Sequence, residues 1–397
     1  MSIRKAKIEG FRSLREATWE PGKLNVVIGP NGSGKSNLLR VLGLLQKAAT
    51  GDLSKEVLHF GGMAALLWDG QAKELAWTIE ADLMNGDSDP AGERLCYELR
   101  LQQLGVGSAY RVEIERLDRS VLPTVGQTSE TRNLLERLPG NAGTFDYRGE
   151  RVIAPAGTVP EEQSLLWLAT NPLADKTLLG FSNFLASWSI YHDIYVAQQA
   201  PLRQAAVARM ENQVAADGQN LIPVLHTLYT GSRDFKKLVD DAMRAAFSKD
   251  YEELVFPPAA DQRVQLRVRW RSLKTEQSAA DLSDGTIRFL LLLAILGNPT
   301  PGSLISIDEP EIGLHPSMLP IVAELAVDAS ERSQIILTTH SPQLLDAFTG
   351  TPPTTTVAQC VDGETRLSVV DSEELRRWLG EDTLGALFRS GELEGMV

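Results

Sequence analysis

The sequence has few cysteines, no long apolar run and no excess of positive charge, and each absence excludes a class of protein. Only Cys96 and Cys360 occur in 397 residues, which excludes a disulfide-stapled secreted scaffold and predicts a cytoplasmic protein with reduced thiols. The longest apolar run, residues 289–296, is too short to span a bilayer, and no apolar segment typical of a signal peptide follows Met1. We therefore expect no membrane partner.

The net charge of the chain restricts how it could bind nucleic acid. The net charge of −13 argues against a surface coated with basic groups for non-specific binding to nucleic acid. A local basic groove is still compatible with it.

A phosphate-binding loop is the strongest positive signal. Residues 29–36 read GPNGSGKS, which fits the spacing G-x-x-x-x-G-K-[ST]. Residues 24–28 predict a buried strand before the loop, and residues 37–45 predict a helix after it. Glycines let backbone N–H groups turn toward an anion, and the helix N-terminus adds partial positive charge. The candidate nucleotide-binding residues are Gly29, Pro30, Asn31, Gly32, Ser33, Gly34, Lys35, Ser36 and Asn37. In this motif the lysine reaches the β- and γ-phosphates, and the hydroxyl that follows it binds Mg²⁺.

Strand-like alternation dominates the residues after the predicted helix. Within residues 57–118 three runs alternate apolar and polar side chains and are separated by turn-rich gaps at 85–87 and 105–108, which predicts an antiparallel meander. Residues 120–160 are rich in Gly, Pro, Thr and Ser and predict an irregular excursion. Residues 189–197 predict another strand.

The chain divides into three expected segments. Residues 1–199 form a nucleotide-binding lobe with the meander and the irregular insertion. Residues 200–252 form a helical subdomain, because the apolar period is helical from 201 to 247. Residues 253–397 form a lobe that carries the remaining motifs and ends in two strands within 357–370 and two helices within 371–388.

An alternating arginine strip stands at the start of the last segment. Leu266, Val268 and Trp270 alternate with Arg267, Arg269 and Arg271, so a strand here places the three arginines on one face. One interpretation is a basic strip for a phosphate backbone. The other, which we favour, is a half-buried strand whose arginines pair with the surrounding acids.

Two further strands end in polar residues suited to phosphate chemistry. The apolar run 303–307 ends at Asp308 and Glu309, where one carboxylate can hold a metal ion and the next can orient or deprotonate an attacking water. The apolar run 334–339 ends at His340. At the carboxyl edge of a parallel sheet, where such folds place their ligands, His340 is a candidate sensor of the γ-phosphate.

In this order the motifs resemble those of the ABC-type ATPases, and within them the branch that contains SMC proteins, RecF and OLD-family ATPases. The motifs are GPNGSGKS (29–36), LSDGTIRFL (282–290), LISIDEPEIGLHP (304–316) and ILTTHS (336–341). The resemblance implies an α/β fold, namely an ABC ATPase head (a P-loop NTPase) with an antiparallel β-meander lobe and a helical subdomain. It implies ATP and Mg²⁺ as cofactors.

The resemblance also implies roles for single residues. Lys35 and Ser36 correspond to the phosphate-binding lysine and the Mg²⁺ ligand, and Asp308 to the second metal ligand. Glu309 corresponds to the general base, and His340 to the switch histidine that senses the γ-phosphate.

A second copy of the chain is implied as well. Ser283 and Gly285 occupy the signature position, where in this family they contact the γ-phosphate held by the opposite protomer, so a head-to-tail homodimer is expected. Ser283 precedes the apolar helix 286–296, whose N-terminus suits an anion. Asp284 departs from the usual glycine, and because an acid repels phosphate we expect Asp284 to point away.

Two residues are assigned on weaker signals. In ABC folds a glutamine joins the two lobes and helps to ligate Mg²⁺, and Gln198 is the candidate here. The alternative is that Gln198 and Gln199 are two solvent-exposed loop residues. The segment GFRSL (10–14) is also similar to the SMC branch, which makes Arg12 a candidate nucleotide contact, although its position alone indicates only a polar residue at a strand end.

Two segments typical of related families, coiled-coil arms and a Toprim nuclease domain, are not expected in this chain. No sustained heptads lie between Ser36 and Leu282, so the arms of an SMC protein are not expected. The stretch after His340 is too short for the Toprim nuclease domain of OLD proteins. A stand-alone ATPase closest to RecF-like and AAA-type ATPases is therefore the expectation.

Two functional classes stay open. In the first, the chain is an ATP-hydrolysing, DNA-associated motor or sensor in DNA repair or antiphage defence that acts with a separate effector protein. In the second, it is a regulatory or scaffold ATPase that switches a protein partner without contacting DNA. A nucleotide-binding subunit of a membrane transporter is disfavoured, because that class typically carries LSGGQ and a compact domain.

Overall fold

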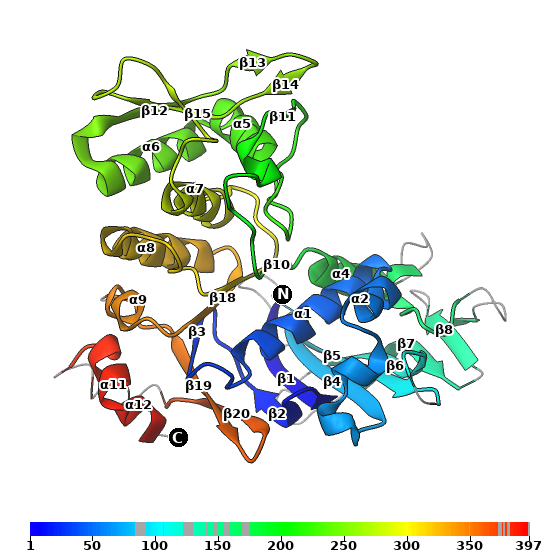
Figure 1. Ribbon diagram of the computed structural model, residues 1–397. Helices are drawn as coiled ribbons and strands as arrows, with labels where there is room; N and C mark the ends of the chain where they lie inside the picture. Colours follow the sequence, from blue (N-terminus) through cyan, green and yellow to red (C-terminus); the bar gives the residue numbers. More distant parts are fainter. Residues whose placement is uncertain are drawn as a thin grey trace. The chain divides into compact units, whose positions relative to one another are not determined.

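The chain folds into two compact units. The structure is a computed structural model that describes residues 1–83, 93–105, 107–121, 130–139, 141–145, 150–153, 159–168, 175–348, 350–371, 375, 378 and 382–395. The first unit comprises Met1–Trp188 and Thr354–Val370, and the second comprises Ser189–Pro353 and Asp371–Met396 (Figure 1). The division into the segments 1–199, 200–252 and 253–397 stays a prediction.

An eight-stranded antiparallel sheet forms much of the first unit. Its strand order is β2-β1-β4-β5-β6-β7-β8-β9. Strands such as β5 alternate buried and half-buried residues, as expected for a sheet with one face on the core. The meander predicted for residues 57–118 is thereby confirmed, although the gap at 85–87 lies outside the described residues. The strands are β1 (Ser2–Phe11), β2 (Leu14–Trp19), β4 (Glu74–Leu83), β5 (Glu93–Gln103), β6 (Tyr110–Val121), β7 (Glu130–Leu138), β8 (Asn141–Phe145) and β9 (Arg151–Ile153).

The irregular excursion predicted for 120–160 was wrong in its described parts, where β7, β8 and β9 continue the meander. The alternation that identifies a strand is broken in β7, because Leu134 and Leu135 are both buried. Leu117 pairs with Leu135 and Asp118 with Asn133, so Leu134 is the extra residue of a bulge. Only the pairing with β6 reveals this segment as a strand.

One buried carboxylate ties the meander to the segment that follows it. Glu115 on β6 is fully buried and accepts hydrogen bonds from Tyr97 Oη at 2.9 Å, Ser164 Oγ at 2.6 Å and the backbone N–H of Leu165 at 2.6 Å. Burial raises the pKa of Glu115, and these donors oppose the rise. The carboxylate therefore anchors residues 164–166 against the sheet.

A second group of strands in the first unit carries the phosphate loop. The buried strand β3 (Leu24–Ile28) pairs in parallel with β19 (Thr354–Val361), which pairs antiparallel with β20 (Glu364–Val369). Both the strand predicted at 24–28 and the pair predicted within 357–370 are confirmed. Helix α1 (Lys35–Thr50) begins inside the motif and runs longer than predicted, and α4 packs beside it (Figure 1). The other helices of this unit are α2 (Leu53–His59), α3 (Met63–Leu66), η1 (Trp68–Gly70), η2 (Leu166–Leu168) and α4 (Lys176–Ala186).

Three parallel strands organise the second unit. Strands β10 (Ser189–Tyr191), β17 (Leu304–Asp308) and β18 (Gln334–Thr339) lie in the order β10-β17-β18. The strands predicted at 303–307 and 334–339 are confirmed, whereas the strand predicted at 189–197 ends at Tyr191 because the residues after it pair with no neighbouring strand. The helices α7 (Asp284–Leu296), η5 (Pro316–Met318), α8 (Leu319–Ser330) and α9 (Pro342–Asp346) follow or separate these strands.

The predicted helical subdomain is only partly helical. Helices α5 (Leu221–Gly231) and α6 (Arg233–Phe247) confirm its second half, but residues 206–220 form no α-helix. Two three-stranded sheets accompany these helices, in the orders β11-β14-β13 and β12-β15-β16. The elements are η3 (Pro201–Arg203), β11 (Ala206–Val207), η4 (Ser248–Asp250), β12 (Tyr251–Val255), β13 (Pro258–Ala259), β14 (Arg263–Val264), β15 (Arg267–Trp270) and β16 (Gln277–Ser278).

The described C-terminal residues form α11 (Leu384–Ser390) and α12 (Glu392–Gly395), and the rest of the helical prediction for 371–388 falls largely outside the described residues. Across the part of the chain that the structure describes, every helix is either too short or too polar to cross a membrane. Cys96 and Cys360 are free thiols.

Candidate functional site

Three glycines of the phosphate loop adopt backbone conformations that favour glycine. Gly29, Gly32 and Gly34 adopt φ angles of 146°, 81° and 98°, a region that L-residues rarely enter. A Cβ on Gly29 would lie 2.2 Å from the Ala358 carbonyl oxygen, and one on Gly34 would lie 2.0 Å from Thr365 Oγ1. The loop backbone therefore packs directly against β19 and β20.

Two side chains in the loop, those of Lys35 and Ser33, indicate that its ligand is an anion. Lys35 is buried and its Nζ donates to the carbonyl oxygens of Gly29 at 2.7 Å and Pro30 at 3.1 Å, so the ammonium group is held within the loop. Ser33 Oγ is buried without a hydrogen-bond partner, and a phosphate oxygen would satisfy it. Gly34 is the N-cap of α1 and offers no side chain to cap it, and backbone N–H groups at a helix N-terminus attract an anion.

A hydrogen-bonded chain supports the loop from behind. Asn37 Nδ2 donates to Ser13 Oγ at 2.8 Å, and Thr365 Oγ1 lies 2.7 Å from Ser13 Oγ and 2.9 Å from the Ser33 carbonyl oxygen. Thr365 is buried on β20. Sequence reasoning missed Thr365, because nothing in its local pattern signals proximity to a loop more than three hundred residues earlier.

Arg12 lies in a strained turn, directly before Ser13 of this hydrogen-bonded row. Its φ is 44°, its N–H donates to the Leu66 carbonyl oxygen at 2.8 Å, and its guanidinium lies 5.3 Å from the centre of the Phe60 ring. Burial, and then the nearby charge of Arg40, lower the pKa of Arg12. The nucleotide contact expected of Arg12 stays a prediction.

In the second unit, the parallel pairing of β17 with β18 brings three predicted residues together. Asp308 pairs in register with Thr338, and Thr338 Oγ1 donates to Asp308 Oδ1. The N–H of Glu309 donates to the Thr338 carbonyl oxygen at 3.1 Å, and Glu309 Oε1 lies 3.1 Å from His340 Nδ1. Glu309 adopts φ 48°, an unusual angle for a residue with a side chain, and this turn directs its carboxylate toward the histidine.

A second carboxylate fixes the backbone on which His340 stands. Glu311 Oε1 accepts from Thr339 Oγ1 at 2.5 Å and from the N–H of His340 at 3.4 Å. Burial raises the pKa of Glu311, against the effect of these hydrogen bonds. Sequence reasoning quoted Glu311 within the DEPE run but gave it no role.

The predicted signature residues lie at the start of α7. Ser283 is the N-cap, and its Oγ accepts from the N–H of Thr286 at 3.1 Å. Gly285 abuts the loop after β17, since a Cβ there would lie 2.5 Å from the Gly313 carbonyl oxygen. Glycine at 285 is thus required by packing within the chain, whatever contact it makes with a nucleotide.

Arg203 explains why an acid stands at position 284. Its buried guanidinium donates to the carbonyl oxygens of Val196 at 2.7 Å, Ala279 at 3.1 Å and Leu282 at 2.5 Å, and it pairs with Asp284. Asp284 therefore neutralises a buried cation that holds the signature segment in place. Sequence reasoning missed Arg203, which a local pattern does not distinguish from a surface arginine.

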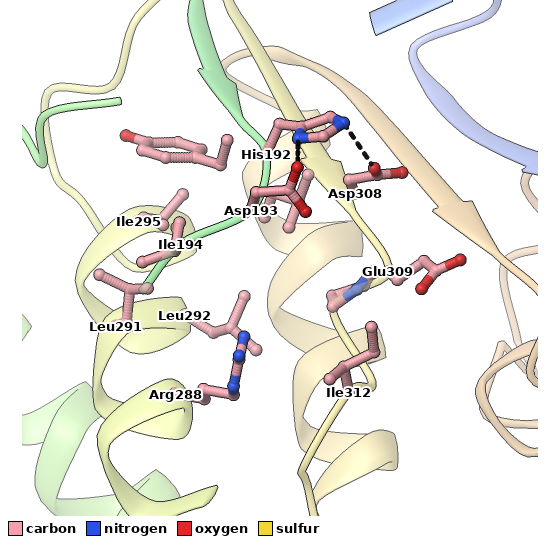
Figure 2. A pocket seen from close by; sticks show the side chains of 13 residues that line it. His192, Asp193, Ile194, Arg288, Leu291, Leu292, Ile295, Asp308, Glu309 and Ile312 are labelled. Atoms are coloured by element: carbon pink, nitrogen blue, oxygen red, sulfur yellow. Dashed lines mark ion pairs between the residues drawn. The ribbon is translucent and has the colours of Figure 1, made fainter. Parts of the chain in front are cut away.

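His192, which sequence reasoning also missed, lies beside Asp308. Its Nε2 is 3.3 Å from Asp308 Oδ2 and its Nδ1 is 2.6 Å from Asp193 Oδ2. Figure 2 shows the imidazole between the two carboxylates, with the side chain of Glu309 directed away from α7. Gln198 lies in an exposed turn beyond this segment, and its role in metal binding stays a prediction.

A small cavity of about 110 Å³ adjoins these groups within the second unit. Residues 191–194 line one side, α7 contributes Arg288 and three aliphatic side chains, and residues 307–310 with Ile312 close it (Figure 2). Burial lowers the pKa of Arg288.

In the arginine strip, Arg269 pairs with neighbouring acids, as the interpretation that we favoured predicts. Arg269 on β15 pairs with both Glu253 and Glu276, and Arg267 donates to Gln265 Oε1. The charge of Arg269 is thereby compensated within the chain.

Comparison with known proteins was consistent with these motifs. Residues 166–346 match the family model described as "AAA domain, putative AbiEii toxin, Type IV TA system", and residues 1–91 match the model described as "AAA ATPase domain". No curated protein sequence matches the chain.

Solved structures with a similar fold include SMC heads. An SmcHead bound to the C-winged helix domain of ScpA is 16% identical and covers 95% of this chain and 100% of its own, with a TM-score of 0.55. An Smc head domain with an extended coiled coil, bound to the C-terminal domain of ScpA from Pyrococcus furiosus, is 13% identical and covers 96% of this chain and 98% of its own, with a TM-score of 0.53. The α/β class and the ABC ATPase head expected from the sequence are confirmed. Residues 1–91 and 166–346 thus resemble AAA ATPase domains, and the chain has the fold of an SMC head.

Proposed function

We propose that this ATPase hydrolyses ATP, with Glu309 as the general base and His340 as the residue that reads the γ-phosphate. The observation that carries the proposal is the 3.1 Å contact between Glu309 Oε1 and His340 Nδ1 beside Asp308. A carboxylate held next to a histidine at the ends of parallel strands can accept a proton from water while the histidine donates to a phosphate oxygen.

We propose Ser36 and Asp308 as residues that would bind Mg²⁺. The Ser36 hydroxyl on α1 and the Asp308 carboxylate at the end of β17 are of the types that Mg²⁺ binds together with phosphate. When bound, the ion neutralises charge on the β- and γ-phosphates. Lys35 and the hydroxyl of Ser33 would hold the phosphates within the loop, and Gln198 and Arg12 are further proposed contacts.

The hydrolytic form is proposed to be a head-to-tail homodimer. Ser283 and Gly285 stand at the exposed N-terminal end of α7, where helix-end N–H groups attract an anion. In this arrangement they would contact the γ-phosphate bound by a second copy, and turnover would wait on dimerisation.

For the physiological role we propose a DNA-associated motor or sensor in DNA repair or antiphage defence that acts with a separate effector. The support is the fold, since the two similar SMC heads were solved bound to a domain of ScpA. A shared fold does not fix a shared function, and a direct DNA-binding measurement tests this part of the proposal.

A second candidate is a regulatory ATPase that switches a protein partner without contacting DNA. The observation that favours it is the pairing of Arg269 with two glutamates, which removes a cation from the only arginine strip that the sequence suggested for DNA. The net charge of −13 points the same way.

The core proposal is tested by Glu309→Gln in size-exclusion chromatography with light scattering. We expect this variant to bind ATP and to run as a dimer only when ATP is present, whereas Lys35→Ala binds no ATP and runs as a monomer. A monomer in both variants at saturating ATP would refute the dimer. Normal hydrolysis by Glu309→Gln would refute the assignment of the base.

DNA binding by the ATP-bound Glu309→Gln protein separates the two physiological roles. Affinity that falls steeply with added salt supports DNA association. Absence of binding at low salt supports the second candidate.

A further inference from the structure

The buried hydroxyl of Thr365 touches the backbone of the phosphate loop, although it stands 332 positions after Ser33. Strand β20, which carries Thr365, belongs to the same compact unit as the loop. Thr365 Oγ1 lies 2.9 Å from the Ser33 carbonyl oxygen and 2.7 Å from Ser13 Oγ. A Cβ on Gly34 would lie only 2.0 Å from the same hydroxyl oxygen, so the hydroxyl and the loop backbone are in direct contact.

The hydrogen bonds of this row run in one direction. A guanidinium only donates, and Arg40 Nη1 lies 3.3 Å from Asn37 Oδ1, so the amide nitrogen of Asn37 faces Ser13 and donates to it. At the other end the Ser33 carbonyl oxygen only accepts, so the single hydroxyl hydrogen of Thr365 goes to it. Ser13 therefore donates its own hydrogen to Thr365 Oγ1. Hydrogen bonds in such a row polarise and strengthen one another.

The last hydrogen bond of the row fixes a peptide plane within the loop. The peptide bond between Ser33 and Gly34 is trans, and in a trans peptide the C=O and the N–H point in opposite directions. Because the Ser33 carbonyl is held toward Thr365, the N–H of Gly34 points away from β20. Gly34 is the N-cap of α1, so this N–H stands at a helix N-terminus, where it suits an anion.

We propose that Thr365 is a positioning residue of the nucleotide site, whose hydroxyl holds the Ser33–Gly34 peptide in the orientation that receives a phosphate. This inference rests on the proposed function, because it takes residues 29–36 as the phosphate-binding loop. Without the hydroxyl, the Ser33 carbonyl loses a buried donor, and the glycine that follows it permits other backbone angles. Binding then has to order the loop, and nucleotide affinity falls by that cost.

The test compares nucleotide affinity with stability in the full chain. Isothermal titration calorimetry measures equilibrium binding of ADP with Mg²⁺, and urea denaturation measures the free energy of unfolding. Thr365→Ala removes the hydroxyl, and we expect its ADP affinity to fall about three- to tenfold, the effect of one lost hydrogen bond. Thr365→Ser keeps the hydroxyl and should bind ADP nearly as the natural protein does.

Thr356→Ala on β19 is the matched control. Thr356 is buried in the same hairpin, but its hydroxyl accepts from Trp19 Nε1 at 3.0 Å instead of contacting the loop. Its loss should lower the free energy of unfolding and leave ADP affinity unchanged. Ser13→Ala removes the preceding member of the row, and its effect on ADP affinity should be less than additive with that of Thr365→Ala, because both act through one row.

The outcomes separate this inference from the proposed function. Natural ADP affinity in folded Thr365→Ala overturns the inference, and so does an equal loss of affinity in Thr356→Ala or in Thr365→Ser. If Thr365→Ala does not fold, as judged by circular dichroism, Ser13→Ala decides, and natural affinity in that variant overturns the inference. A natural protein that binds no ADP, or Lys35→Ala that binds it equally well, refutes the phosphate loop itself.

Discussion

Glu309 and His340 face each other across the ends of β17 and β18, with 3.1 Å between Oε1 and Nδ1. The contact follows from strand register, because Asp308 pairs with Thr338 and each strand then continues for one or two residues to the polar side chain. Glu309 reaches its position through a backbone angle of φ 48°, which is the kind of strain that occurs at functional sites.

The first prediction concerns this carboxylate. Glu309→Gln keeps the size of the side chain but cannot accept a proton from water, so we expect turnover to fall by about 10²–10⁴-fold with nucleotide affinity nearly unchanged. Phosphate release and equilibrium binding of ATP measure the two quantities. Glu324→Gln, an exposed change on α8, controls for the loss of one negative charge. A fall in affinity that accounts for the lost turnover would contradict the assignment.

The second prediction concerns the arginine under the signature segment. Arg203→Ala removes the donor for three backbone carbonyl oxygens and the partner of Asp284, so the free energy of unfolding should fall by about 3 kcal/mol. Asp284→Asn should cost less, because the amide oxygen still accepts and the side chain is partly exposed. Urea denaturation measures both, with the exposed Arg209→Ala as the control. Equal effects of Arg203→Ala and Arg209→Ala would show that Arg203 does not hold the segment.

The third prediction concerns Gly285→Ala. Whether alanine raises or lowers the free energy of unfolding depends on the tertiary contacts of the added Cβ. A Cβ at 285 would stand 2.5 Å from the Gly313 carbonyl oxygen, whereas a Cβ at Gly43 on α1 meets no atom within 4 Å. Gly43→Ala should therefore stabilise the chain by about 0.5–1 kcal/mol through helix propensity. Gly285→Ala should destabilise it by about 1–3 kcal/mol through overpacking. Thermal or urea unfolding of the two variants decides it, and stabilisation in both would disprove the close approach.

The fourth prediction concerns pH. Burial raises the pKa of Glu115 above its ordinary value, so folding favours its protonated form. Its contribution to stability is therefore fully present below the unfolded pKa of about 4.3 and is lost as pH rises through the folded pKa. Glu115→Gln removes this titration. Compared with the natural protein, the variant should lose less stability between about pH 4.3 and neutrality, and a parallel pH dependence in the two proteins would show that Glu115 titrates normally.

Much of the fold was predictable from the sequence where the local signal was strong. The strands at 24–28 and 334–339 and the phosphate loop were identified from short patterns, because an apolar run before a glycine-rich or polar turn is encoded by adjacent residues. Strand β7 was missed, since the bulge at Leu134 breaks its alternation. The strand predicted to reach Ala197 was too long, because only Ser189–Tyr191 pairs with β17.

The sequence by itself determined which chemical groups are present and in what order, from Lys35 through Ser283 to Asp308, Glu309 and His340. Their spacing is a property of the chain, and it identified the family of motifs before any contact was known. Tertiary structure decided which of these groups meet, and it added Thr365, Arg203 and His192, none of which carries a local signal. Strand register set the contact between Glu309 and His340, and a buried arginine explained the acid at 284. Such contacts join residues tens to hundreds of positions apart, so no window of the sequence contains both partners.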